Sequence, residues 1–217
     1  MPAPKLADHF STWEVQDASM RFGMWAFLGQ ELMLFAGLFG LYASYRYMYG
    51  ADFENAISAN DWRLGSGNTL ILLSSSFTAA LAVWSARENR TKLIPVMLVL
   101  TMLAGFAFMG IKAFEYHQHW EEGLLPGRFY HADAELVAKF GIATFGANRF
   151  FTLYWVMTGL HGLHVLVGIG VVGWCLRRSL QKGYYSSEHN VGLELGMLYW
   201  HLVDVMWIFI WPLLYLG

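Results

Sequence analysis

Long apolar stretches alternate with polar segments along the whole sequence. The stretches cover residues 24–45, 66–86, 93–111, 150–176 and 195–217. They contain two acidic residues and no Lys or Arg. A helix needs about 20 residues to span a bilayer, because a rise of about 1.5 Å per residue must cover about 30 Å of hydrocarbon. The pattern therefore predicts an all-α integral membrane bundle of five transmembrane helices, forming a single membrane domain over residues 1–217.

The segment ahead of the first stretch, residues 1–23, is polar and mixed in charge. Ser11 and Glu14 have the S-x-x-E spacing of a capping box, which predicts a short amphipathic helix in this tail. The apolar stretch that follows is 22 residues long, longer than the apolar core of a secretory signal. We therefore expect the first helix to be retained.

Composition supports a surface that faces lipid. Hydrophobic residues make up 56% of the chain and charged residues 14%, whereas a soluble domain carries about 25% charged residues. Cys175 is the single cysteine, so the chain alone cannot build a disulfide framework or a multi-cysteine metal site. A net charge of −2 argues against a nucleic-acid partner.

The distribution of Lys and Arg predicts the orientation in the membrane. Eight lie in segments on the side of the amino terminus and six on the other side, where they are spread over longer connections. The eight are Lys5, Arg21, Arg87, Arg90, Lys92, Arg177, Arg178 and Lys182, and the six are Arg46, Arg63, Lys112, Arg128, Lys139 and Arg149. We expect a cytoplasmic amino terminus and a periplasmic carboxyl terminus.

Few ionisable or imidazole side chains fall within the apolar stretches. They are Glu31, His161, His164, His201 and Asp204. An ionisable group inside a bilayer costs several kcal/mol unless it is partnered, so each is a candidate functional residue. His161 and His164 lie on one helical face, and we expect packing roles with hydrogen bonds to neighbouring helices. For His201 and Asp204, also three residues apart, we expect a role in orienting the bundle.

Polar residues also crowd together after the third apolar stretch. They are Glu115, Tyr116, His117, His119, Glu121 and Glu122, just after Lys112. A metal site is one interpretation, but histidines at a helix end more often lie in the wet interface. Lys112 and Glu115 have the i, i+3 spacing of an ion pair at a helix end.

A haem or copper centre requires several imidazoles or thiolates that converge on one point. Three intramembrane histidines, two of them on one helical turn, are a poor basis for such a centre. The sequence therefore predicts no metal site, no cofactor of its own and no catalytic residue in this chain.

Motifs in all five stretches resemble subunit III of the haem-copper oxidases. They are FLGQELMLFAGLF at 27–39, NTLILLSSS at 68–76, GFAFMGIKAFEY at 105–116, TGLHGLHVLVG at 158–168 and YWHLVDVMWIF at 199–209. The resemblance implies a metal-free helical subunit that packs on the catalytic subunit, with haem and copper in the partner subunits. Glu31, His161, His164, His201 and Asp204 match the family's intramembrane motifs, and Lys112 and Glu115 match its KxxEY motif.

The resemblance also implies partners and a location. These are oxidase subunits I and II, membrane lipid and the bacterial inner membrane. Bound phospholipid and membership of a larger respiratory supercomplex are left open at this point. The family supports proton uptake and protects the catalytic subunit during turnover. Longer members have two further helices ahead of the position of Glu31, so we expect a five-helix bacterial form. Glu31, where an Asp could stand, favours the cytochrome c oxidase branch.

Three other functions are open at this point. Five-helix members also occur in quinol oxidases and in nitric-oxide-reductase-associated complexes. Glu31 and Asp204 could form a proton relay in an independent small transporter. The absence of internal sequence repeats and the motifs in all five stretches favour the oxidase accessory subunit over the transporter.

Overall fold

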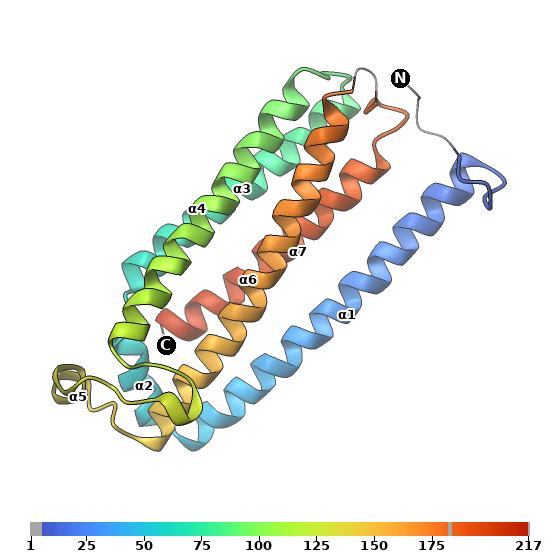
Figure 1. The fold of residues 1–217 in the computed structure, drawn as a ribbon. Helices are drawn as coiled ribbons and strands as arrows, with labels where there is room; N and C mark the ends of the chain where they lie inside the picture. The colour runs from blue at the N-terminus through green and yellow to red at the C-terminus, as the bar shows by residue number, and fades with distance from the viewer. Residues whose placement is uncertain (1–5, 182–183, 217) are drawn as a thin grey trace. The chain divides into compact units, whose positions relative to one another are not determined.

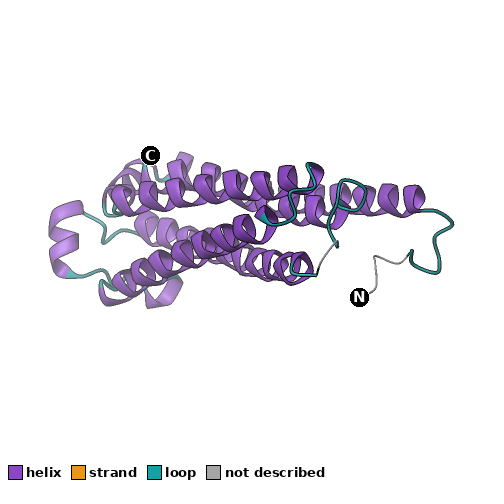
Figure 2. Ribbon diagram, turned by 90° about the horizontal axis from the view of Figure 1, so that it is seen from above, coloured by secondary structure: helices purple, strands orange, loops and turns teal. Residues whose placement is uncertain are grey.

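The structure, a computed structural model, describes residues 6–181 and 184–216. Over these residues it is helical and contains no strand, as Figure 2 shows. Five helices are long and apolar enough to cross a membrane. They are α1 (Trp13–Met48), α3 (Trp62–Arg87), α4 (Leu93–Glu121), α6 (Phe145–Ser179) and α7 (Val191–Tyr215), labelled in Figure 1. The prediction of an all-α protein with five spanning helices is confirmed.

Three short helices lie in the connections and were not expected from the sequence. They are α2 (Gly50–Ser58), the 3-10 helix η1 (Gly127–Phe129) and α5 (Ala134–Phe140). The carboxylate of Asp133 accepts a hydrogen bond from the backbone N–H of Glu135 and starts α5. Gly141, at φ +66°, ends it in the left-handed conformation that glycine adopts readily. Helices α2 and α5 contact each other.

Helix α1 begins well before the apolar stretch that predicts it. Its first residue is Trp13, and the backbone N–H of Val15 donates to Oγ1 of Thr12 at 3.3 Å. The described part of the tail therefore continues into the spanning helix instead of forming a separate one, and Thr12, not Ser11, supplies the capping oxygen. Lys5, Lys182 and Gly217, which entered the sequence predictions, lie outside the described residues.

The chain divides into two compact units, and every spanning helix contributes a segment to each. Unit 1 comprises Met1–Met33, Leu72–Phe106 and Val165–Asp204, and unit 2 comprises Leu34–Ile71, Ala107–His164 and Val205–Gly217. Residues far apart in the sequence meet within each of them.

Unit 1 packs around the indole of Trp200, which is fully buried. A Cβ atom added at Gly105 of α4 or at Gly168 of α6 would lie 2.8 Å from this ring. The indole Nε1 donates to Oγ of Ser75 on α3 at 3.0 Å. Two small residues thus admit a large ring of α7, as is common where helices pack in membranes.

In unit 2, two side chains from outside α7 donate hydrogen bonds to backbone carbonyls at the end of this helix. The Tyr42 hydroxyl of α1 donates to the carbonyl of Leu213, and Nδ2 of the buried Asn60 donates to the carbonyl of Leu214 at 2.9 Å. The last carbonyls of a helix lack partners within the helix. These two side chains provide partners inside the protein, next to Pro212.

Candidate functional site

The expected pair of Lys112 and Glu115 forms in unit 2, one turn apart on α4. Nζ of Lys112 lies 2.9 Å from Oε2 of Glu115. The sequence predicted this pair at the end of a spanning helix, and the two side chains are 6% and 4% exposed. The pair is therefore an interior ion pair, which stabilises a protein only when its remaining hydrogen bonds are satisfied.

Two tyrosines from other helices satisfy this ion pair. Nζ of Lys112 also donates to the hydroxyls of Tyr154 on α6 and Tyr215 on α7, at 2.8 and 3.1 Å. Both hydroxyls donate in turn to Oε1 of Glu115, that of Tyr154 at 2.8 Å. An ammonium group has three donors, and all three have acceptors here. The four side chains form a closed hydrogen-bonded network, which we call the Lys112 network, that joins α4, α6 and α7.

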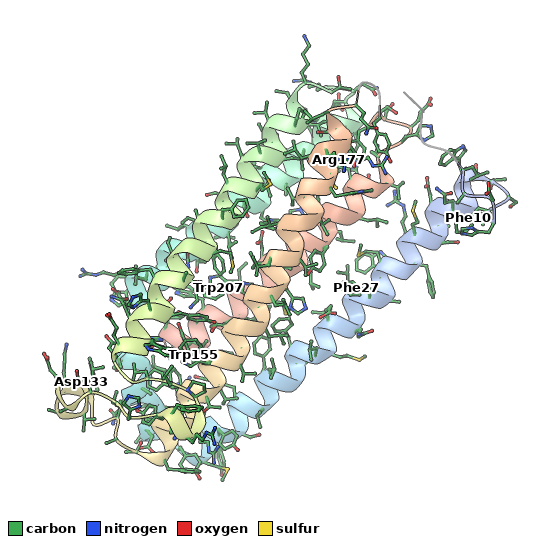
Figure 3. The ribbon with its side chains drawn as sticks, viewed as in Figure 1. Phe10, Phe27, Asp133, Trp155, Arg177 and Trp207 are labelled. Carbon is green, nitrogen blue, oxygen red and sulfur yellow. The ribbon has the colours of Figure 1, made fainter. Side chains whose placement is uncertain are left out.

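Aromatic faces surround the ammonium group of this network. Nζ of Lys112 lies 4.8 Å from the ring centroid of Tyr154 and 5.5 Å from that of Trp207. Tyr116 and Tyr215 contribute rings at 5.2 and 5.8 Å. Such faces attract a cation that has left water. Figure 3 labels Trp207 on α7.

The other polar residues after the third stretch divide between two faces of α4. His119 is buried against the ring of Tyr154, with centroids 4.8 Å apart. His117 is exposed and lies 3.6 Å from Glu121. His117 is thus exposed, as a position in the wet interface requires, whereas His119 is buried. Among residues 6–181 and 184–216, no three His, Cys, Asp or Glu side chains are placed to hold a metal ion.

His161 and His164 belong to unit 2 and have different surroundings. The ring of His161 is fully buried between Phe108 and Trp207, with centroids 5.6 and 5.2 Å away. Neither of its ring nitrogens has a hydrogen-bond partner among the described residues, which differs from the sequence expectation. Nδ1 of His164 contacts the Leu160 carbonyl of its own helix at 2.8 Å.

His201 and Asp204 belong to unit 1, where they meet the serines of α3. Nδ1 of His201 lies 2.7 Å from Oγ of Ser76. Oδ2 of the buried Asp204 accepts a long hydrogen bond, 3.5 Å, from Ser75, which also accepts from Trp200. The serines of the NTLILLSSS motif thus contact the YWHLVDVMWIF motif. This contact orients α7 against α3.

Glu31 is a buried residue of unit 1 on α1, 8% exposed. Phe27, one turn earlier on the same face and labelled in Figure 3, has its ring centroid 6.0 Å from that of Tyr199 on α7. The Glu31 carboxyl interacts electrostatically with the Tyr199 phenol. The carboxylate that matches the family's first intramembrane motif is therefore buried and interacts with α7.

The connection between α4 and α6 contains groups whose pKa values are shifted. Burial, with smaller contributions from the charges of Asp133 and Glu121, raises the pKa of Glu122 above its usual value. Burial and the charge of Asp52 raise the pKa of Tyr130 to about 12. The Tyr130 hydroxyl donates to the carbonyl of Ile142, so its proton has a partner inside unit 2.

Sequence reasoning missed Tyr154, Tyr215, Ser75 and Ser76. The serine triplet and the tyrosines inside apolar stretches were visible, but tyrosine is common near the ends of spanning helices and gave no separate signal. Only the fold brings these hydroxyls to the charged and imidazole groups. Together these groups link helices through buried hydrogen bonds.

The chain is similar to subunits of respiratory oxidases. The family model for cytochrome c oxidase subunit III matches residues 7–217. A cytochrome c oxidase subunit 3 of Synechocystis sp. is 33% identical over 90% of this chain and 74% of its own length, and one of Alkalihalophilus pseudofirmus is 31% identical over 89% and 84%. A probable quinol oxidase subunit 3 of Staphylococcus aureus is 27% identical over 90% and 88%. The chain, with motifs of this kind in all five spanning helices, belongs to the cytochrome c oxidase subunit III family.

Proposed function

We propose that this protein is the non-catalytic subunit III of a bacterial respiratory terminal oxidase of the cytochrome c type. In this function it packs on subunit I beside subunit II, and it supports the stability and proton uptake of the catalytic subunit while oxygen is reduced. The Lys112 network is the observation that carries the proposal. The charged residues of the KxxEY motif hold three helices together inside unit 2 and have no remaining donor for a substrate.

The remaining polar groups support the same interpretation. His201 and Asp204 contact serines of α3, and His161 lies between two aromatic rings. These are packing and orienting contacts of a scaffold. We therefore assign haem and copper to the partner subunits and no cofactor to this chain.

The proposed location is the bacterial inner membrane, with the amino terminus in the cytoplasm and the carboxyl terminus in the periplasm. The basic residues counted for the cytoplasmic side, including Arg21, Arg87 and Arg177, fall within unit 1. Arg46, Arg63, Lys112, Arg128, Lys139 and Arg149 all fall within unit 2. The larger number and higher density of basic residues in the segments counted for the cytoplasmic side support this orientation.

The similarity to a probable quinol oxidase subunit 3 favours one second candidate, the equivalent subunit of a quinol oxidase. The two candidates differ in the electron donor of the complex. Higher identity to cytochrome c oxidase subunits, 33% against 27%, favours the cytochrome c type.

Purification of the complex through a tag on this chain, in mild detergent, tests both candidates. Mass spectrometry of the co-purifying chains should identify subunits I and II, and oxygen consumption should depend on reduced cytochrome c. Consumption that depends on a quinol would select the second candidate. A chain that purifies alone, or with its own haem or copper, would contradict the proposal.

The supporting role requires a separate measurement. Complexes with and without this subunit are compared for initial oxygen consumption and for its decline during sustained turnover. We expect similar initial rates and faster inactivation without the subunit. Equal lifetimes during turnover would remove support for this role.

A further inference from the structure

A pocket in unit 2 lies where two helices end. It has a volume of about 460 Å³ and is lined by the last turn of α2, the residues up to the start of α3, and the end of α7. Ser58 is the last residue of α2, and Tyr215 is the last residue of α7. The Lys112 network reaches this pocket only through Tyr215, and the other lining side chains take no part in that network.

The two helix ends give the pocket a negative electrostatic character. The last carbonyls of a helix carry a negative partial charge, which a basic residue in the last turn can offset. Neither α2 nor α7 has a basic residue in its last turn. Two negative helix ends therefore meet at this pocket without a cation from their own last turns.

Two lining side chains add acceptor oxygens to these helix ends. Asn60 is 6% exposed, and its Nδ2 donates to the carbonyl of Leu214, whereas its Oδ1 has no hydrogen-bond partner among the described residues. Glu54 is exposed, and its carboxylate enters none of the ion pairs found within residues 6–181 and 184–216. The lining residues include no Lys, Arg or His. The pocket therefore favours a cation that donates hydrogen bonds.

The walls of the pocket indicate what kind of cation fits. A Ca²⁺ ion requires about 6–8 oxygen ligands at about 2.3–2.6 Å, which is a much smaller site than this one. Ile57 and Leu216 provide apolar walls, and Trp62, which is 55% exposed, provides an aromatic one. Arg63, which does not line the pocket, already places its guanidinium 5.8 Å from the centroid of the Trp62 ring. A cationic group on an aliphatic stem would use the acceptors, the ring and the apolar walls together.

We infer that this pocket receives a basic side chain, arginine or lysine, from a neighbouring subunit of the oxidase complex. Its cationic group contacts the Glu54 carboxylate and Oδ1 of Asn60, and its stem lies against Trp62. A side chain held on a bound partner has a high effective concentration at the pocket, which a free amine in solution lacks. The inference rests on the proposed function, because that function places a partner chain beside this one.

Photo-crosslinking in the intact complex identifies the occupant. Trp62 is replaced by photoreactive p-benzoylphenylalanine, which keeps an aromatic ring at the pocket wall. Illumination should join this residue to a peptide of another subunit that contains Arg or Lys. Mass spectrometry of the joined peptides identifies that subunit.

Substitutions at Glu54 test the charge of the pocket. Glu54→Gln should make this chain leave the complex about 30-fold faster, because the loss of one partner of a charge pair buried by docking acts mainly on dissociation. Glu54→Asp keeps the charge and should have a smaller effect. Glu135→Gln is the matched control, because Glu135 is an exposed carboxylate of unit 2 that does not line the pocket. Native mass spectrometry, after washes at increasing salt concentration, measures the chain retained.

A third variant tests the space in the pocket. Ser58 is an exposed lining residue, so Ser58→Trp should fill the pocket while the Glu54 carboxylate stays in place. We expect it to speed the loss of this chain as Glu54→Gln does. Circular dichroism should show the helical content of the parent in all these variants, because the substituted side chains are exposed.

Four results would overturn the inference. Parental retention in Glu54→Gln and Ser58→Trp would show that no partner side chain occupies the pocket. Equal losses in Glu54→Gln and Glu135→Gln would indicate a general charge effect. Crosslinks to lipid alone, or to peptides without Arg or Lys, would assign the pocket to another occupant. A small amine that is recovered from the parent complex and absent from Glu54→Gln, with all chains retained, would make it a site for a free cation.

These results are distinguishable from a failure of the proposed function. A chain that purifies without any oxidase subunit would contradict the proposed function itself. An intact complex that gives any of the four results would contradict only the docking of a basic side chain at this pocket.

Discussion

The indole of Trp200 occupies the space that a side chain at Gly168 would need, since a Cβ atom there would lie 2.8 Å from Cε3 of the ring. Gly168→Ala should therefore force the helices of unit 1 apart and destabilise the protein by about 1–3 kcal/mol. Thermal unfolding of the purified complex measures this. Gly170→Ala is the matched control on the same helix, because nothing lies within 4 Å of an added Cβ there. The control should be neutral or slightly stabilising, and an equal loss in both variants would contradict the packing argument.

The Lys112 network predicts unequal effects of single and double substitutions. Glu115→Gln leaves a buried ammonium group without its counter-charge, and the loss of one partner of a buried ion pair costs about 3–5 kcal/mol. Lys112→Met with Glu115→Gln removes both charges and should cost much less. Unfolding in denaturant, followed by subunit retention, checks both. Additive losses in the double variant would show that the two groups are not coupled.

His161 should tolerate replacement by an apolar ring. Its two nitrogens have no hydrogen-bond partner among the described residues, and a buried unsatisfied polar group costs about 1–3 kcal/mol. His161→Phe should therefore leave the melting temperature unchanged or raise it. His164→Phe, which loses the contact with the Leu160 carbonyl, should lower it. A large decrease for His161→Phe would mean that its nitrogens are bonded in the assembled complex.

Two substitutions of Glu31 distinguish a structural role of this residue from a role in proton transfer. Glu31→Gln keeps the shape and hydrogen bonding of this buried side chain, whereas Glu31→Ala also removes its packing. For a structural role, which we favour, Gln should be nearly silent and Ala should loosen the subunit from its partners. Impaired sustained oxygen consumption in both variants would instead indicate proton chemistry. If both variants keep the oxygen consumption of the parent complex and stay bound to their partner subunits, Glu31 has neither role.

Glu122 predicts a pH dependence of the connection between α4 and α6. Its folded pKa is raised, so the folded state favours the protonated carboxyl. The protonated Glu122 carboxyl therefore contributes to the stability of the folded state. This contribution is fully present below the pKa of Glu122 in the unfolded chain and is lost as pH rises through its pKa in the folded state. Glu122→Gln should remove this dependence and be the more stable protein at neutral pH. Hydrogen exchange of residues 122–133, measured from about pH 4 to about pH 7, tests this. Faster exchange in the variant at neutral pH would contradict the sign.

The sequence predicted the spanning helices well, because a bilayer imposes length and apolarity on each segment separately. The contact between Lys112 and Glu115 could also be predicted from local sequence, because residues three apart on a helix lie on the same face. Their burial and their bonds to Tyr154 and Tyr215 depend on contacts at least 39 residues away in the sequence, which no local pattern encodes. Short helices such as α2 and α5 were missed because they carry too few residues for a periodic signal.

The first and last spanning helices hold each other at sites in both units. Arg21 pairs with Glu194 across 173 residues, and Tyr42 bonds Leu213 across 171. During synthesis α1 enters the membrane before α7, so its partners on α7 emerge only after the helices between them. Contacts of such long sequence separation form late in folding. A chain interrupted before α7 would thus leave α1 without these anchors, so correct assembly of the bundle depends on the synthesis of α7.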